Sequence, residues 1–224
     1  MLVDLGYVER TDPTHYRLVR LPGEMTGAKS SWGSLLRLLA DPLLQAVAAT
    51  GESGFLAVLT DGKTVHYLNK IMPEREIRYD RDITVPRLAC KVSSGIVLLG
   101  SLPTDDMETY AVAAARAGDT MLTAADLVAE VQEALNKGYH ANPRGIVEGA
   151  AGVAAPIRDR SGTIVAALNI AGPAARMSES LGDITQQTVS HAHLCSAKLT
   201  EARAHSFHGG GSAHREALTT LEHH

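Results

Sequence analysis

The sequence predicts an α+β domain built on an antiparallel sheet that is flanked by helices. Two segments, FLAVLTDGKTVHYL and GVAAPIRDRSGTIVAALNI, have strand-like runs on either side of a Gly-containing turn, the pattern of β-hairpins. Helical segments lie between and after the hairpins, and the sequence shows no repeated strand–helix–strand units. Because strands joined by short turns pair antiparallel, one antiparallel sheet covered by helices is expected.

The composition is that of a globular protein. The 224 residues are 45% hydrophobic and 21% charged, enough for a buried core. The net charge of −4 excludes a strong positive field over the whole molecule, so any nucleic-acid contact must be local or lie outside the chain. The apolar stretches are shorter than the roughly 20 residues that span a bilayer, and no secretion signal is present, so a cytoplasmic location is expected. Cys90 and Cys195 form no CxxC pair, which gives neither a disulfide framework nor a zinc site.

The first 20 residues predict the remnant of a separate unit. MLVDLG has the pattern of a helix end, and a hairpin of residues 7–10 and 15–18 follows it. A one-turn helix and an isolated hairpin are not stable alone, so this stretch is expected to belong to a larger unit.

Residues 21–50 predict a linker followed by a helix. Apolar residues recur at spacings of three and four between Leu35 and Val47, with a break or a new start at Asp41-Pro42 and an end at residues 52–54. An exposed helix of this kind would also make a dimer surface.

Residues 51–207 predict the main domain. Its first hairpin turns at Asp61-Gly62, and the charged segment REIRYDRDITV is expected as an exposed strand or loop whose Arg75, Arg78 and Arg81 face water. Ser93 and Ser94 stand at the N-cap of a short apolar helix. Helices are expected over 105–116 and 123–137, the second with a Thr123/Asp126 capping pair and a stop at Gly138.

The second hairpin and a last helix complete this domain. The turn at residues 158–162 joins two strands, and Asn169 and Ala171 share one face of the second. A helical stripe runs from Leu181 to Lys198. Residues 208–224 are expected to be a flexible tail, and the final LEHH resembles the stub of an expression tag.

Enzymatic chemistry has no support in the sequence. The GxSxG, HExxH and GxxxxGK[ST] motifs are absent. His191, His193 and Cys195 lie on one predicted helix, but position 193 would point away from the other two, so helix packing explains them better than a metal does. No catalytic residue, metal or cofactor is therefore predicted.

A ligand pocket is the stronger hypothesis. Ser93-Ser94-Gly95 at a helix N-terminus would present backbone N–H groups to a small carboxylate. Small residues on the strand faces of Gly152 and Asn169 would leave space opposite, and Asn169 is a lone polar group that needs a partner if buried. The alternative is that both serines cap the helix and Asn169 faces water.

The ordered set of motifs resembles one family. GYVERTDPTHYRL, ATGESGFLAVLTDGKTVHYL, SSGIVLLGSLP, NKGYHANPRGIVEG and GVAAPIRDRSGTIVAALNIAGP together resemble the IclR-type bacterial transcriptional regulators, from the first residues to about Thr200. The resemblance implies an N-terminal winged helix-turn-helix, a C-terminal effector-binding domain of GAF-like fold, and dimers or tetramers on operator DNA. In that frame residues 1–20 are the end of the recognition helix and the wing, with Arg10, His15 and Arg17 as phosphate contacts.

The resemblance also implies an effector site, with residues drawn from several segments: Ser93, Ser94, Asn142, Gly152, Asn169, Ala171 and Cys90. The chain departs from the usual pattern at several of these positions. Cys90 replaces a common His, Ile96 a Lys and Gly152 a Cys, while residues 169 and 171 are commonly Ser and an acid is often near residue 142. These losses of hydroxyl, thiol and charge suit a larger or more apolar acid, such as an aromatic one.

The predicted function is therefore a regulator whose effector-binding domain senses a small organic acid and controls DNA binding by the oligomer. The alternative is a stand-alone GAF-like sensor module without DNA binding, and an enzyme acting on a small molecule comes third. Because most of the DNA-reading unit is missing from the pattern, the chain as given is expected to bind DNA weakly or not at all.

Overall fold

The computed structural model describes residues 8–10, 16–18, 29–142 and 149–208. Its main sheet has six strands in the order β5-β4-β3-β8-β7-β6, and every neighbouring pair is antiparallel. The strands are β3 (Ser53–Thr60), β4 (Thr64–Ile71), β5 (Arg87–Leu88), β6 (His140–Asn142), β7 (Ala150–Arg158) and β8 (Ile164–Pro173). The helices are α1 (Lys29–Thr50), α2 (Ser93–Leu99), which follows the 3-10 turn η1 (Ala89–Lys91), α3 (Thr104–Ala117), α4 (Ala124–Lys137), α5 (Ala174–Glu179) and α6 (Leu181–His208).

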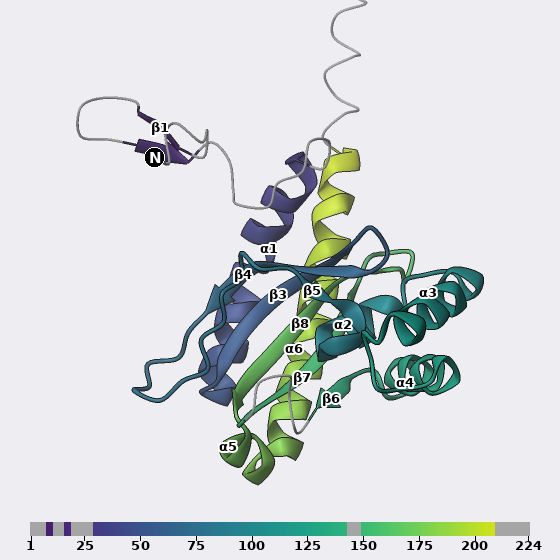
Figure 1. Ribbon diagram of the computed structural model, residues 1–224. Coiled ribbons are helices and arrows are strands. Elements are labelled where there is room, and N and C mark those ends of the chain that lie inside the picture. Colours follow the sequence, from purple (N-terminus) through teal and green to yellow (C-terminus); the bar gives the residue numbers. More distant parts are fainter. Residues whose placement is uncertain (1–7, 11–15, 19–28, 143–148, 209–224) are drawn as a thin grey trace, which may run out of the picture.

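Helices cover both faces of the sheet (Figure 1). Leu168 and Ile170 of β8 pack with α1 and α6 in one buried cluster. Ala167 and Ala171, on the opposite face of the same strand, pack with α2, α3 and α4 in a second cluster. The alternation predicted for β8 is therefore confirmed, and so is the α+β class. Asn169 and Ala171 lie on the face of β8 that α2 covers.

Helix α1 differs from the prediction. It runs unbroken through Pro42, because Leu39, Leu43 and neighbouring apolar residues are buried against the sheet and α6 and hold the helix together there. The helix ends at Thr50, since Gly51 adopts a φ of 65°, and Ser53 and Gly54 already belong to β3. The predicted dimer stripe is therefore mostly core, although Leu44 is 55% exposed.

Other turns and caps follow the sequence. Asp61 (φ 52°) and Gly62 (φ 67°) make the first hairpin turn, and Gly138 ends α4 in the left-handed conformation. The Thr123 hydroxyl accepts a hydrogen bond from the Asp126 N–H at 3.2 Å, as the capping pair predicts.

The ends of the chain and one strand complete the comparison. Strands β1 (Val8–Arg10) and β2 (Tyr16–Leu18) pair antiparallel, as predicted; the turn between them and the tail from residue 209 lie outside the described residues. Asn142, expected in a loop, instead ends the edge strand β6 and pairs with Gly152. Within the described parts of the chain, no helix is both long and apolar enough to cross a membrane.

Candidate functional site

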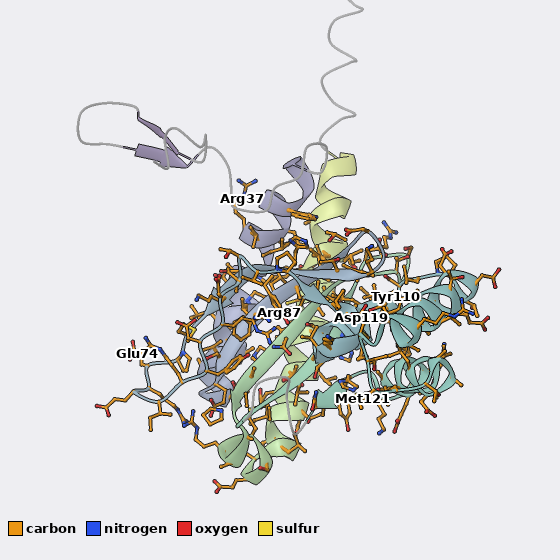
Figure 2. The ribbon with its side chains drawn as sticks, in the orientation of Figure 1. Arg37, Glu74, Arg87, Tyr110, Asp119 and Met121 are labelled. Carbon is orange, nitrogen blue, oxygen red and sulfur yellow. The ribbon has the colours of Figure 1, made fainter. Side chains whose placement is uncertain are left out.

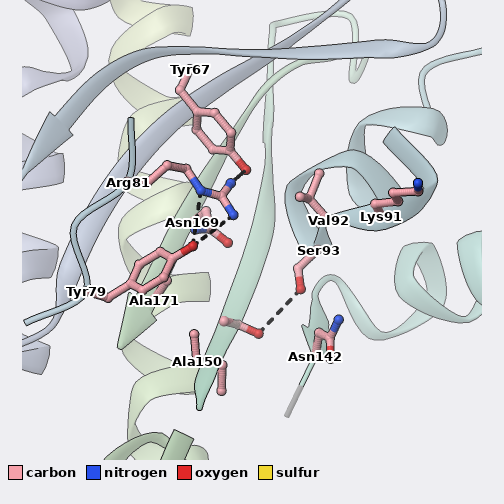
Figure 3. Close-up of a pocket in the computed structure, with 12 residues that line it drawn as sticks. Tyr67, Tyr79, Arg81, Lys91, Val92, Ser93, Asn142, Ala150, Asn169 and Ala171 are labelled. Carbon is pink, nitrogen blue, oxygen red and sulfur yellow. Dashed lines mark hydrogen bonds between the residues drawn. The ribbon is translucent and has the colours of Figure 1, made fainter. Parts of the chain in front are cut away.

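A pocket lies on the α2 face of the sheet, between α2, strands β4, β7 and β8, and the irregular segment of residues 72–86 that joins β4 to β5 (Figure 3). We call residues 72–86 the strap. The side chains and backbone that line the pocket come from Tyr67, Tyr79, Arg81, Lys91, Val92, Ser93, Asn142, Ala150, Ala151, Gly152, Asn169 and Ala171.

Five of the seven predicted effector residues line this pocket: Ser93, Asn142, Gly152, Asn169 and Ala171. The strand pairing explains why they meet, because Asn142 pairs with Gly152 and Gly152 pairs with Ala171 in neighbouring strands. These strand residues form the floor of the pocket. The Ser93 hydroxyl donates a hydrogen bond to the Gly152 carbonyl at 3.4 Å and so connects α2 to the floor.

The two alternative interpretations made from the sequence are wrong. The N-cap of α2 is Val92, with an extended φ of −131°, and no side chain caps the helix; Ser93 and Ser94 are its first two residues. Asn169 is only 6% exposed and lines the pocket, so its side chain does not face bulk water.

Ser94 and Cys90 do not line the pocket. Ser94 is fully buried behind it, and its hydroxyl lies 3.0 Å from the Tyr67 hydroxyl, so it supports a lining residue. Cys90 points away from the pocket: its N–H donates to the Tyr110 hydroxyl at 2.9 Å, and its Sγ lies 3.7 Å from the Asp119 carbonyl oxygen. Figure 2 labels Tyr110, which belongs to α3, and Asp119, which follows the end of that helix.

Sequence reasoning missed the cationic and aromatic part of the site. Arg81 was expected to face water, but its guanidinium donates to the hydroxyls of Tyr67 and Tyr79 and lies 4.7 Å from the centre of the Tyr67 ring and 5.7 Å from that of Tyr79. Both tyrosines stand edge-on to the buried Phe55. A lone aromatic, Tyr79, within a charged segment was the available signal that the strap folds back onto the sheet.

The electrostatics of the lining favour an anion. Arg81 contributes positive charge, the exposed Lys91 side chain points away from the pocket (Figure 3), and the part of the lining that the structure describes contains no Asp or Glu. Burial raises the pKa of Tyr67, which outweighs the lowering by the Arg81 cation and the Ser94 hydrogen bond, so its phenol stays neutral at physiological pH. Among the described residues, Arg81 forms no ion pair with a carboxylate.

The pocket is small as it stands. Its cavity of about 30 Å³ has room for about two water molecules, whereas a cavity that holds a benzene ring measures roughly 150 Å³. A ligand with a ring therefore needs the Arg81 side chain or the strap to move.

Within the described part of the chain, His191 and His193 of α6 do not lie in a metal site. His191 is 9% exposed and its Nδ1 lies 2.7 Å from the Gln187 carbonyl oxygen, while His193 is exposed. Over the ranges that the structure describes, no three His, Cys, Asp or Glu side chains are grouped so as to hold a metal ion.

Comparisons with known proteins agree on one family. Residues 34–201 match the domain family described as "Bacterial transcriptional regulator IclR C-terminal". A solved structure from Rhodococcus sp. RHA1, described as a transcriptional regulator, is 27% identical over 89% of this chain and 81% of its own, with a TM-score of 0.67. No curated protein matches the chain.

Two further solved structures share the fold at lower identity. An IclR homologue from Microbacterium hydrocarbonoxydans, complexed with 4-hydroxybenzoate, is 22% identical over 91% of this chain and 82% of its own, with a TM-score of 0.65. The effector domain of a protein described as the regulator IclR from Acinetobacter sp. ADP1 is 14% identical over 72% of this chain and 95% of its own, with a TM-score of 0.63.

Proposed function

The chain belongs to the IclR family of bacterial transcriptional regulators, which are not enzymes, and we propose that the pocket beneath its strap binds a small organic acid as effector. In this proposal the acid is bound and not transformed. Its binding shifts the protein between states that differ in DNA affinity, in the manner of an allosteric ligand.

One observation carries the proposal: the Arg81 guanidinium reaches into the pocket, and among the described residues it pairs with no carboxylate and no lining side chain is acidic. A guanidinium that is partly buried gains most from a carboxylate, which it binds through two parallel hydrogen bonds. The tyrosine hydroxyls that Arg81 now contacts are neutral and are weaker partners than a carboxylate. An acid in the pocket would therefore take their place.

The remaining lining suits an apolar, ring-containing body for the acid. The rings of Tyr67 and Tyr79 offer flat walls, and Ala150, Gly152 and Ala171 keep the floor free of bulk. The N–H group of Ser93, the first residue of α2, is a donor that a helix leaves without a partner of its own, and Asn169 adds a side-chain amide. The complex of the Microbacterium homologue with 4-hydroxybenzoate supports an aromatic acid as the first candidate class.

The test is a thermal-shift titration with benzoate and 4-hydroxybenzoate, with benzamide as the uncharged control. A ligand at 100 times its Kd raises the unfolding free energy by about 2.7 kcal/mol, so a carboxylate that binds raises Tm by more than benzamide does at the same concentration. Asn169→Ala should abolish the shift, Ser94→Ala should reduce it by removing the partner of the Tyr67 hydroxyl, and the exposed Asn136→Ala should keep it. A shift of equal size in Asn169→Ala would contradict the assignment of the site.

DNA binding and assembly form a second part of the proposal. We propose that Arg10 and Arg17, in the β1–β2 hairpin, contact DNA phosphates, together with His15, which lies outside the described residues. Each phosphate contact should change the dependence of DNA affinity on salt, so in a regulator that carries the complete winged helix-turn-helix Arg17→Ala should lower the slope of log K against log salt by about one. Action on operator DNA as a dimer or tetramer in the cytoplasm, and the division of the chain near residues 20, 50 and 207, stay predictions.

A further inference from the structure

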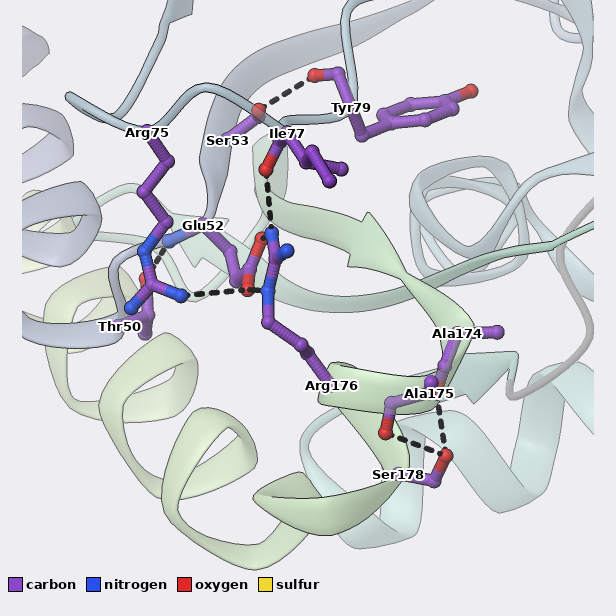
Figure 4. Close-up of polar contacts among 10 residues, drawn as sticks. All are labelled: Thr50, Glu52, Ser53, Arg75, Ile77, Tyr79, Ala174, Ala175, Arg176 and Ser178. Atoms are coloured by element: carbon purple, nitrogen blue, oxygen red, sulfur yellow. Dashed lines mark hydrogen bonds and ion pairs between the residues drawn. The ribbon is translucent and has the colours of Figure 1, made fainter.

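The strap carries Tyr79 and Arg81 into the pocket, and side chains from elsewhere hold it there. Arg176 Nη2 donates to the Ile77 carbonyl at 3.0 Å, and the Ser53 hydroxyl donates to the Tyr79 carbonyl at 2.5 Å (Figure 4). Lys70 Nζ donates to Asp80 at 2.6 Å and to the Arg81 carbonyl at 3.0 Å. These bonds fix the path of the strap backbone on both sides of Tyr79.

One of these anchors, Arg176, belongs to an ion cluster around a buried carboxylate. The Glu52 side chain is 3% exposed, and its two oxygens accept bonds from Arg176 Nε at 2.6 Å and Nη2 at 2.9 Å. Arg75, a strap residue, approaches the same carboxylate at 3.9 Å. Arg176 therefore binds Glu52 and the strap with one guanidinium, and Glu52 attracts the strap a second time through Arg75.

Two glycines make room for this cluster. A Cβ at residue 172 would lie 2.7 Å from Glu52 Cδ, and one at residue 51 would lie 3.0 Å from Arg75 Cζ. Gly51 follows the last residue of α1, and Gly172 follows Ala171 of the pocket floor. The cluster thus joins four elements: the end of α1, the end of β8, α5 and the strap.

We propose that Glu52 and Arg176 are positioning residues for effector recognition: they hold the strap so that Arg81 projects into the pocket. Neither residue lines the pocket, so they act through the strap. Because the cavity cannot hold a ring as it stands, a bound acid must displace the Arg81 side chain or the strap, and a displacement of the strap strains the bond from Arg176 to the Ile77 carbonyl. The same ion cluster then passes the change to the end of α1. This inference rests on the proposed function for its ligand, but not for its first test.

The first test needs no ligand. Hydrogen exchange followed by mass spectrometry compares peptides from residues 72–86 in the unmodified chain, in Arg176→Ala and in Arg158→Ala. Arg158 is a matched control, because its Nη1 donates to the Gly162 carbonyl at 2.9 Å in the β7–β8 turn. Arg176→Ala should speed exchange in the strap at least tenfold and leave peptides of the β7–β8 turn unchanged, and Arg158→Ala should leave the strap unchanged.

A second variant guards against simple unfolding. Arg176→Lys keeps a positive charge beside Glu52, but an ammonium lacks the planar fork that binds both Glu52 oxygens and the Ile77 carbonyl together. It should fold and still exchange the strap at least threefold faster. Strap exchange at the original rate in both variants would overturn the inference and leave Glu52 and Arg176 a purely structural pair.

The second test uses benzoate and benzamide as probes. If Arg176 acts by positioning Arg81, the ratio of benzoate to benzamide affinity falls at least fivefold in Arg176→Lys. In the double variant Arg81→Gln/Arg176→Lys this ratio should be the same as in Arg81→Gln alone. Additive losses in the double variant would contradict the inference. If benzoate and 4-hydroxybenzoate bind to neither the unmodified chain nor its variants, the proposed aromatic effector fails, while the exchange result still decides the role of Arg176.

Discussion

Gly172→Ala is the most informative single change, because it adds one methyl group beside a buried carboxylate. The new Cβ would lie 2.7 Å from Glu52 Cδ and closer still to Oε2, whereas carbon atoms in contact are normally about 3.5 to 4.0 Å apart. The carboxylate must move by about 1 Å, which takes at least one of its bonds with Arg176, now 2.6 and 2.9 Å, beyond hydrogen-bond distance.

The cost follows from those bonds. Hydrogen bonds to charged groups contribute about 1.5 to 3 kcal/mol each, so losing one and weakening the other should lower the unfolding free energy by about 3 kcal/mol. For a chain of this size that is a fall in Tm of about 6 to 12 °C. Differential scanning calorimetry and urea unfolding measure both quantities. Gly182→Ala is the control, since no heavy atom lies within 4 Å of its added Cβ; it should not lower Tm, and the higher helix propensity of alanine in α6 should keep or slightly raise it.

A double variant isolates the cause. Without the Glu52 carboxylate the added methyl has room, so Gly172→Ala should cost less than about 1 kcal/mol when introduced into Glu52→Ala. The two changes would then be non-additive by about 2 kcal/mol, as expected for groups in contact. Equal costs of Gly172→Ala in both backgrounds would refute the steric reasoning.

Three further outcomes test other parts of the fold. Phe55→Ala should cost about 3 to 5 kcal/mol in urea unfolding, because the ring is fully buried and contacts both tyrosines of the pocket; a cost under 1 kcal/mol would contradict that packing. Thr123→Ala should lower the free energy of unfolding by about 1 kcal/mol, whereas Thr123→Ser, which keeps the capping hydroxyl, should lower it much less. Equal stability of Thr123→Ala and the unmodified chain would show that the α4 cap contributes nothing. Burial raises the pKa of the Cys195 thiol from 9.0 to about 12, against the lowering effect of Lys198, so the unfolded chain loses this proton first and stability falls as pH rises above 9. Between pH 9 and 10 that fall is about 1 kcal/mol, and Cys195→Ala should remove it; an unchanged pH dependence would place the thiol outside the core.

The sequence predicted the regular elements well, because their evidence is local. Alternation along β8 identified which residues face α2, and the Asp61-Gly62 and Thr123 signals located a turn and a cap. The break predicted at Pro42 was wrong, since burial of the helix on both sides of the proline outweighs the hydrogen bond that proline cannot make. That burial depends on α6, which lies far away in the sequence.

The sequence predicted the strand residues of the pocket but not the residues of the strap. The floor follows from strand periodicity, but the strap has no periodicity, and its path depends on Lys70, Ser53 and Arg176, the last of them about 100 residues away. Arg81 consequently looked like a surface charge. Glu52 was interpreted as part of a helix end, and its ion pair with Arg176 could not be predicted, because it depends on how β8 and α5 pack against the end of α1.

The way the strap is fastened has a consequence for how such a sensor diverges. Side chains outside the strap donate to its carbonyl oxygens, so those bonds do not depend on which side chains the strap itself carries. Residues such as Arg81 could then be exchanged while the backbone path and the sheet register stay the same. Recognition could change faster than architecture, and an engineer seeking a biosensor for a new acid could randomise strap positions before touching the sheet.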